Sequence, residues 1–110
     1  MKSLFRPLVQ TLMRVAGDFS SGYAEFETEG KVQSTYKAGD WYSFTLRIPK
    51  SKGYDSLELT IRASSPTLPI EGDYVVAKGR IGSWYDKNVN RVRYSFYPNE
   101  MEVWRQGVKV

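Results

Sequence analysis

The feature that most constrains the fold is an alternation of apolar and polar side chains that starts after Gly17 and continues to Val103. Side chains of a strand point alternately to opposite faces, so a period of two residues indicates strands with one buried face. Gly30 interrupts the first strand and indicates a bulge or a sharp bend, which lets one strand serve two sheet edges. The pattern predicts five strands, over residues 23–36, 41–48, 57–63, 74–83 and 92–103, with a break at Pro98 in the last.

Five strands in a chain of 110 residues predict a single all-β domain. We expect a small Greek-key barrel over residues 18–105, of which the five-stranded OB-fold is the most common design. A β-sandwich fragment and an SH3-like barrel show the same alternation and stay open as alternatives. The segment 64–73 contains two prolines and a glycine and is expected to be a loop, and residues 106–110 are expected to form a short tail.

The first 17 residues follow a different period. Leu4, Leu8, Leu12 and Val15 recur at helical spacing, and Gly17 suits the residue after a helix end. We therefore expect a short amphipathic helix over residues 1–17 that packs on the domain or on another subunit. Polar residues interrupt the apolar stretch, which argues against a signal peptide, and a membrane-surface helix is the weaker alternative. No run of 18 apolar residues occurs, so we expect a cytoplasmic protein without a membrane span.

The sequence contains neither cysteine nor histidine. This composition excludes cysteine nucleophiles, Ser–His relays, disulfide frameworks and the usual zinc or haem sites, because each needs one of those side chains. The remaining candidates for metal chemistry are acidic residues that stand singly in turns: Asp40, Asp55, Asp73 and Asp86. We expect no enzymatic activity, no metal and no cofactor.

Positive charge and aromatic rings are concentrated in one part of the chain. Residues 78–93 carry five Lys or Arg side chains and one acidic residue, a local charge of +4 that equals the net charge of the whole chain. Seven of the 16 aromatic residues lie between Tyr74 and Trp104. Cations bind phosphates and flat rings stack on unpaired bases, so this combination is typical of a surface that binds a single nucleic-acid strand.

The segment 72–101 resembles the C-terminal half of the OB domain in the bacterial single-stranded DNA-binding protein family. The matching elements are Gly72, Val75, Ala77, Gly79-Arg80-Ile81, Trp84-Tyr85-Asp86, Arg93-Tyr94 and Glu100-Met101. Upstream, Gly30-Lys31-Val32 and the strand 44–48 are loosely similar. The chain departs from the family in its expected first helix, in the proline-rich loop where the family has a helix, and in its ending WRQGVKV, which is not an acidic tail. It resembles compact relatives of phages, plasmids or other mobile elements.

The resemblance implies that Trp84 stacks on bases, and Tyr85 lies beside it in the sequence. Alternation places five other candidates on outward faces: Trp41, Arg47, Arg62, Lys78 and Arg80. The remaining candidates, Lys87, Arg91 and Arg93, form the charge run of the predicted hairpin. Trp41 opens the second strand, where it either binds bases or caps the barrel end. For each arginine and lysine, contact with phosphate stands beside the simpler interpretation of a solvated side chain. The predicted nucleic-acid-binding residues are Trp41, Arg47, Arg62, Lys78, Arg80, Trp84, Tyr85, Lys87, Arg91 and Arg93.

The expected function is largely sequence-independent binding of single-stranded DNA in replication, recombination or the maintenance of mobile elements. RNA binding by the same surface is one alternative. A second is a protein-interaction OB subunit of a replication or repair assembly, resembling primosomal replication protein N. Homo-oligomers are expected, because several copies increase avidity. Glu25, Glu27 and Glu29 are predicted to form a solvated acidic edge, and this edge would repel phosphates if it lined the binding face.

Overall fold

The computed structural model describes residues 13–16 and 24–110, and these residues form strands and turns without a helix. The strands are β1 (Met13–Ala16), β2 (Glu25–Ala38), β3 (Trp41–Pro49), β4 (Tyr54–Arg62), β5 (Tyr74–Asp86), β6 (Arg91–Arg105) and β7 (Val108–Lys109). The prediction of an all-β domain is confirmed for the residues that the structure describes. No helix in the described segments has the length and apolar character that a bilayer span requires.

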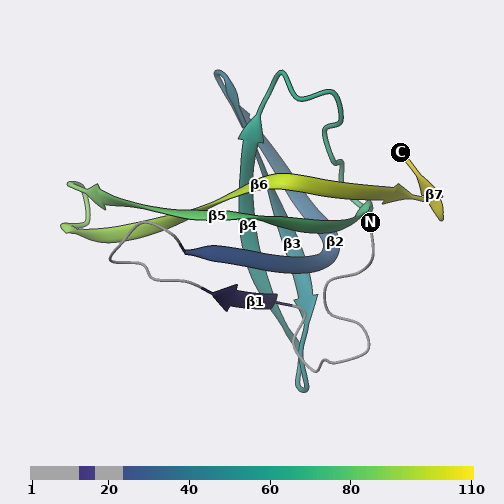
Figure 1. Cartoon of the computed structure of the whole chain (residues 1–110), viewed down its shortest axis with the longest axis horizontal. Coiled ribbons are helices and arrows are strands. Elements are labelled where there is room, and N and C mark those ends of the chain that lie inside the picture. The colour runs from purple at the N-terminus through teal and green to yellow at the C-terminus, as the bar shows by residue number, and fades with distance from the viewer. Residues whose placement is uncertain (1–12, 17–23) are drawn as a thin grey trace.

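Five of the strands close into a barrel (Figure 1). Around the barrel the order is β2, β3, β4, β6 and β5, and β5 pairs with the first half of β2 to complete the circuit. All neighbours are antiparallel except β4 and β6, which run parallel where Leu59 lies opposite Phe96. This closed five-stranded barrel is consistent with an OB-like fold.

The barrel closes because β2 changes partner at Gly30. Residues 25–31 of β2 pair with β5, and residues 31–38 pair with β3. A Cβ atom on Gly30 would lie 2.6 Å from the carbonyl oxygen of Arg47, so only glycine lets β3 approach this closely. A register shift follows between Val32 and Ser34. The expected bend at Gly30, with one strand serving two edges, is confirmed.

The core contains the residues that the alternation placed inward. Phe26, Phe44, Leu46 and Leu59 are fully buried inside the barrel, and the ring of Phe96 packs edge-on against Phe26 with centroids 5.3 Å apart. Two outward-predicted side chains are also buried: Val76 and Glu29. Glu29 accepts a hydrogen bond of 2.7 Å from the Tyr74 hydroxyl. The prediction that all three glutamates of β2 are solvated is therefore wrong for Glu29.

The expected helix over residues 1–17 is wrong for Met13–Ala16, and the rest of that range lies outside the described residues. Met13–Ala16 forms β1, which pairs antiparallel with the first half of β2. In this half β2 pairs with β5 along one edge, while β3 takes only the second half. The other edge therefore offers its backbone N–H and C=O groups to a strand, and this pairing outweighs the helical pattern.

The segment after residue 105, where we expect a short tail, folds back on the barrel strand that precedes it. Gln106 and Gly107 both adopt a positive φ in a tight turn, and Val108–Lys109 returns as β7 against the end of β6.

A buried carboxylate connects the loop after β4 to the end of β6. Asp73 accepts two hydrogen bonds of 2.9 Å from the Arg105 guanidinium and one of 2.9 Å from the backbone N–H of Ile70. Its backbone carbonyl accepts a hydrogen bond from the N–H of Val32, just past the bend in β2. The hydrogen bonds from Arg105, with a smaller contribution from that of Ile70, hold the pKa of Asp73 below its usual value despite burial.

We expect Asp73→Asn to lower the free energy of unfolding at pH 7 by about 2 kcal/mol, because the variant loses charge-assisted hydrogen bonds at a buried site. The pKa of Asp73 is lowered in the folded state, so its stabilisation is complete above the unfolded-state value of about 3.9 and disappears as the pH falls through the folded-state value. Urea unfolding of both proteins at pH 7 and at about pH 2 checks this, since the difference should shrink at the lower pH.

The matched control is Asp55→Asn, which removes an exposed ion pair with Lys50 and should change the unfolding free energy little at either pH. A difference for Asp73→Asn that is equal at both pH values would contradict the role assigned to its charge.

Candidate nucleic-acid interface

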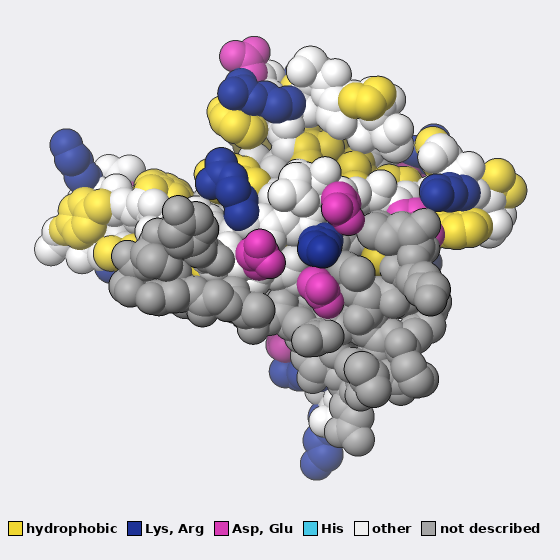
Figure 2. Space-filling view, viewed as in Figure 1, with side chains coloured by type: hydrophobic (Ala, Val, Ile, Leu, Met, Phe, Trp, Pro, Cys, Tyr) yellow, Lys and Arg dark blue, Asp and Glu magenta, His cyan; other side chains and the backbone are white. Residues whose placement is uncertain are grey.

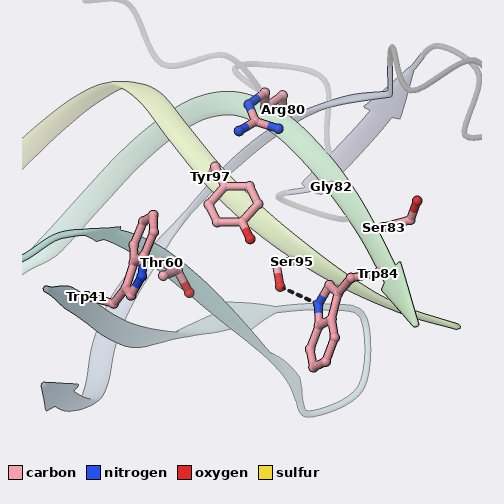
Figure 3. Close-up of a pocket in the computed structure, with 8 residues that line it drawn as sticks. All are labelled: Trp41, Thr60, Arg80, Gly82, Ser83, Trp84, Ser95 and Tyr97. Carbon is pink, nitrogen blue, oxygen red and sulfur yellow. Dashed lines mark hydrogen bonds between the residues drawn. The ribbon is translucent and has the colours of Figure 1, made fainter. Parts of the chain in front are cut away.

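A groove crosses the outer surface of β3, β4, β5 and β6. It consists of two adjoining hollows, of about 390 and 630 Å³, that share Trp41, Thr60, Arg80 and Tyr97 as lining residues. The smaller hollow continues to Trp84 and Ser95 on the β5–β6 hairpin (Figure 3). The larger one continues past Arg62 to the loop after β4. We call this combined surface the aromatic groove.

Three aromatic side chains lie along the aromatic groove. Trp41 at the start of β3 and Tyr97 on β6 have ring centroids 6.2 Å apart, with their planes inclined by 51°. Trp84 on β5 lies at the hairpin end, where its indole N–H donates a hydrogen bond of 3.0 Å to the Ser95 hydroxyl, drawn as a dashed line in Figure 3. The side chains of Trp41 and Trp84 are 41% and 44% exposed, so these rings offer free surface to a ligand.

Each of these three rings has an arginine beside it. The guanidinium carbon of Arg62 lies 4.4 Å from the Trp41 ring centroid, and that of Arg80 lies 4.9 Å from the Tyr97 centroid. Arg93 is 5.8 Å from the Trp84 ring. Guanidinium groups are attracted to the faces of aromatic rings and still have N–H donors available for phosphate. The groove therefore combines π-surfaces with positive charge.

Gly82 makes room for the Tyr97 ring. A Cβ atom on Gly82 would lie 2.9 Å from Cε2 of Tyr97, so the ring packs directly on the β5 backbone. Tyr97 is not among the site residues predicted from the sequence, because a break in the strand is expected at Pro98. This expectation is wrong: β6 continues through Pro98, which pairs with Gly79 next to a register shift. The signal was present in the alternation: Phe96 points inward, so Tyr97 points outward, and it pairs with Arg80.

The β5–β6 hairpin extends beyond the barrel as an arm (Figure 1). Trp84 and Tyr85 are consecutive, so their side chains lie on opposite faces of the arm. Tyr85 pairs across the arm with Val92, and its hydroxyl donates a hydrogen bond to the side-chain oxygen of Asn90. Tyr85 does not line the aromatic groove, although the sequence grouped it with Trp84.

Asp86 holds the tip of the arm together. Its carboxylate accepts a hydrogen bond of 2.9 Å from the backbone N–H of Asn88 and one of 3.1 Å from Arg93. The bond from Asn88, with the contribution of Arg93, lowers the pKa of Asp86. Arg93 therefore bridges Asp86 and the Trp84 ring, while Lys87 and Arg91 are exposed near the tip.

The other predicted cations lie outside the aromatic groove. Lys78 is half-buried and lies between Glu27 on β2 and Glu100 on β6 in the strand registers. On the face of the molecule drawn in Figure 2, acidic and basic side chains are interspersed near the centre. Arg47 lies at the far end of β3, where its guanidinium stacks on Tyr54.

The groove thus brings together four of the ten residues predicted from the sequence: Trp41, Arg62, Arg80 and Trp84. None of the glutamates of β2 lines it, and every described lining residue is apolar, polar and uncharged, or an arginine. The acidic edge predicted from the sequence therefore lies outside this surface.

Comparison with family models, curated proteins and solved structures finds no match. The resemblance to the single-stranded DNA-binding protein family therefore stays a prediction that rests on the residues quoted above. The chemistry of the groove itself is the basis for assigning a function.

We expect Gly82→Ala to displace the Tyr97 ring, because the new methyl group would occupy the space that the ring edge now fills. The free energy of unfolding should change by less than about 1 kcal/mol, since alanine is favoured over glycine in a strand and offsets part of the strain. NMR chemical shifts of the Tyr97 ring and the Trp41 indole measure the displacement. Ser83→Ala, at an exposed neighbouring position, is the control and should leave both signals in place. Unchanged Tyr97 signals in Gly82→Ala would show that the ring does not depend on this glycine.

Proposed function

We propose that this protein binds single-stranded DNA, without catalysis and largely without regard to base sequence. The observation that supports this most strongly is the row of three rings in an open groove, each with an arginine within 6 Å. Bases stack on Trp41, Tyr97 and Trp84. Arg62, Arg80 and Arg93 contact the phosphates between them. Such stacking tolerates every base, because each base has a π-face.

The barrel topology supports the same proposal. We assign it to the OB-fold, because the order β2, β3, β4, β6, β5 closes on β2 and only β4 and β6 are parallel. In OB-folds the second and third barrel strands and the adjoining loops form the usual surface for oligonucleotides. Here these strands are β3 and β4, which contribute Trp41, Thr60 and Arg62 to the aromatic groove.

The charge of the groove favours a polyanion over a neutral ligand. Both hollows contain arginine, and no carboxylate is among their described lining residues. Duplex DNA presents its phosphates but keeps its bases stacked inside. Its phosphates can therefore contact the arginines, but its bases cannot stack on the aromatic rings. We therefore expect single strands to bind more tightly than duplex, and the affinity to fall as salt rises.

Titration of tryptophan fluorescence with an oligomer of thymidine tests this proposal. We expect Trp41→Ala and Trp84→Ala each to weaken binding by about 5- to 150-fold, the equivalent of roughly 1–3 kcal/mol for one stacked base. Raising the salt from about 50 to 200 mM should weaken binding to the wild-type protein steeply. A deoxyuridine oligomer and its RNA counterpart, titrated in parallel, measure the preference for the sugar.

Trp104→Phe is the matched control, because Trp104 is half-buried on β6, donates to Glu102 and does not line the groove. This variant should keep the wild-type affinity. Absence of quenching by any single strand at low salt would overturn the proposed function. Equal loss in Trp104→Phe and Trp84→Ala would show that the effect is not located in the aromatic groove.

A further inference from the structure

An arginine-on-ring pair occurs a second time on the outer face of β3 and β4, far from the aromatic groove. At the groove end, Arg62 of β4 stacks on Trp41 of β3 with a distance of 4.4 Å to the ring centroid. At the opposite end the strands exchange roles, and Arg47 of β3 stacks on Tyr54 of β4 at 3.8 Å. The Tyr54 side chain is 42% exposed, nearly the same fraction as Trp41. The same chemistry is therefore present at both ends of one surface.

A strip of polar side chains connects the two pairs, and all of them are small and uncharged except Glu58. Trp41 lies opposite Arg62, and Arg47 lies opposite Ser56, in one antiparallel register. Between them, on the same face, Ser43 lies opposite Thr60 with their hydroxyls 3.2 Å apart, and Thr45 lies opposite Glu58. Arg47 lies six positions after Trp41 along β3, which corresponds to about 20 Å.

The charges around Arg47 favour a phosphate on one side of this strip. Lys31 of β2 is the register partner of Arg47, and both line a hollow of about 380 Å³ together with Gln33 and Glu71. Two lysines, Lys50 and Lys52, lie in the adjoining β3–β4 turn, where Lys50 pairs with Asp55. Two cations and one carboxylate, that of Glu71, line this hollow, so its net charge is positive. Glu58 lies on the β4 side of the strip. A polyanion is therefore expected to run along the β2 side, over Lys31 and Arg47.

We propose that Lys31, Arg47 and Tyr54 form a second subsite for the same nucleic-acid strand, which we call the distal subsite. The strand leaves the aromatic groove at Trp41, follows the strip along β3, and places a base on Tyr54 and phosphates on Lys31 and Arg47. This inference rests on the proposed function and adds a length requirement to it. The strip of about 20 Å corresponds to about six nucleotides at the stacked rise of about 3.4 Å, and to fewer in a stretched strand.

The length requirement makes the distal subsite testable with two thymidine oligomers, of about 5 and about 15 nucleotides, which lie within the range that single OB domains cover. The short oligomer fills the aromatic groove, and the long one also reaches Tyr54. We expect Tyr54→Ala and Arg47→Gln to weaken binding of the long oligomer by about five- to tenfold, as for the loss of one stacked base or its cation, and to leave the short one unchanged. Fluorescence anisotropy of labelled oligomers measures both affinities.

Lys52→Gln is the matched control, because it removes a charge from the same hairpin without changing the Arg47–Tyr54 pair. It should lower the affinity for the long oligomer less than Arg47→Gln does. Trp41→Ala should lower the affinity for both oligomers. Circular dichroism and urea unfolding confirm that each variant is folded, and Arg47→Gln keeps the inference testable if Tyr54→Ala fails to fold.

The outcomes separate the two proposals. If the wild-type protein binds neither oligomer, the proposed function fails and the distal subsite fails with it. If it binds both, and the Tyr54 and Arg47 variants bind the long oligomer as tightly as the wild-type protein does, single-strand binding stands and the distal subsite is overturned. Equal losses for both oligomers also overturn it, because they would place the effect in the groove or in the fold.

Discussion

Closure of the barrel depends on β2, which leaves β5 and joins β3 at Gly30, where a backbone oxygen of Arg47 occupies the space of a side chain. A strand that stayed with one neighbour would leave the sheet open, with unpaired backbone groups along two edges. The bend also exposes one edge in the first half of β2, and β1 pairs there. On the other side of the bend, the backbone of Asp73 contacts Val32, so the Asp73–Arg105 pair connects the bend to the end of β6.

The aromatic groove is a consequence of this closure. Trp41 and Tyr97 lie on strands that do not pair with each other, and they meet because β3 and β6 are both neighbours of β4. The parallel pairing of Leu59 with Phe96 sets the register of β6 against β4, and therefore the position of Tyr97 relative to Trp41. Gly82 and Arg80 then determine how the ring lies on β5. The site belongs to the closed barrel, and no single hairpin contains it.

The sequence correctly predicted which side chains of each strand point into the barrel and which point outward. It did not predict what covers the outer faces. Alternation placed Phe44 and Leu46 inside and Trp41, Arg62 and Arg80 outside, because a period of two residues follows directly from strand geometry. It does not show whether other parts of the chain cover an outer face, and it therefore predicts exposed positions for Glu29 and Val76, which are buried. Alternation also places Tyr97 on an outer face, but it does not give the strand register, which puts Tyr97 beside Arg80 in the aromatic groove. The helical pattern around Val15 was local, whereas the free edge of β2 that binds Met13–Ala16 exists only in the folded barrel.

If bases bind in the groove as proposed, the arginines beside its rings also affect the thermodynamics of binding. In the free protein, part of each π-face in the groove is already covered by a guanidinium group and is shielded from water. A base that takes this position displaces an organic cation as well as solvent, so it removes less apolar surface from water than stacking on a bare ring would. Since the heat-capacity change of binding follows the apolar area that is buried, occupation of this groove has a smaller negative heat-capacity change than three uncovered rings would produce.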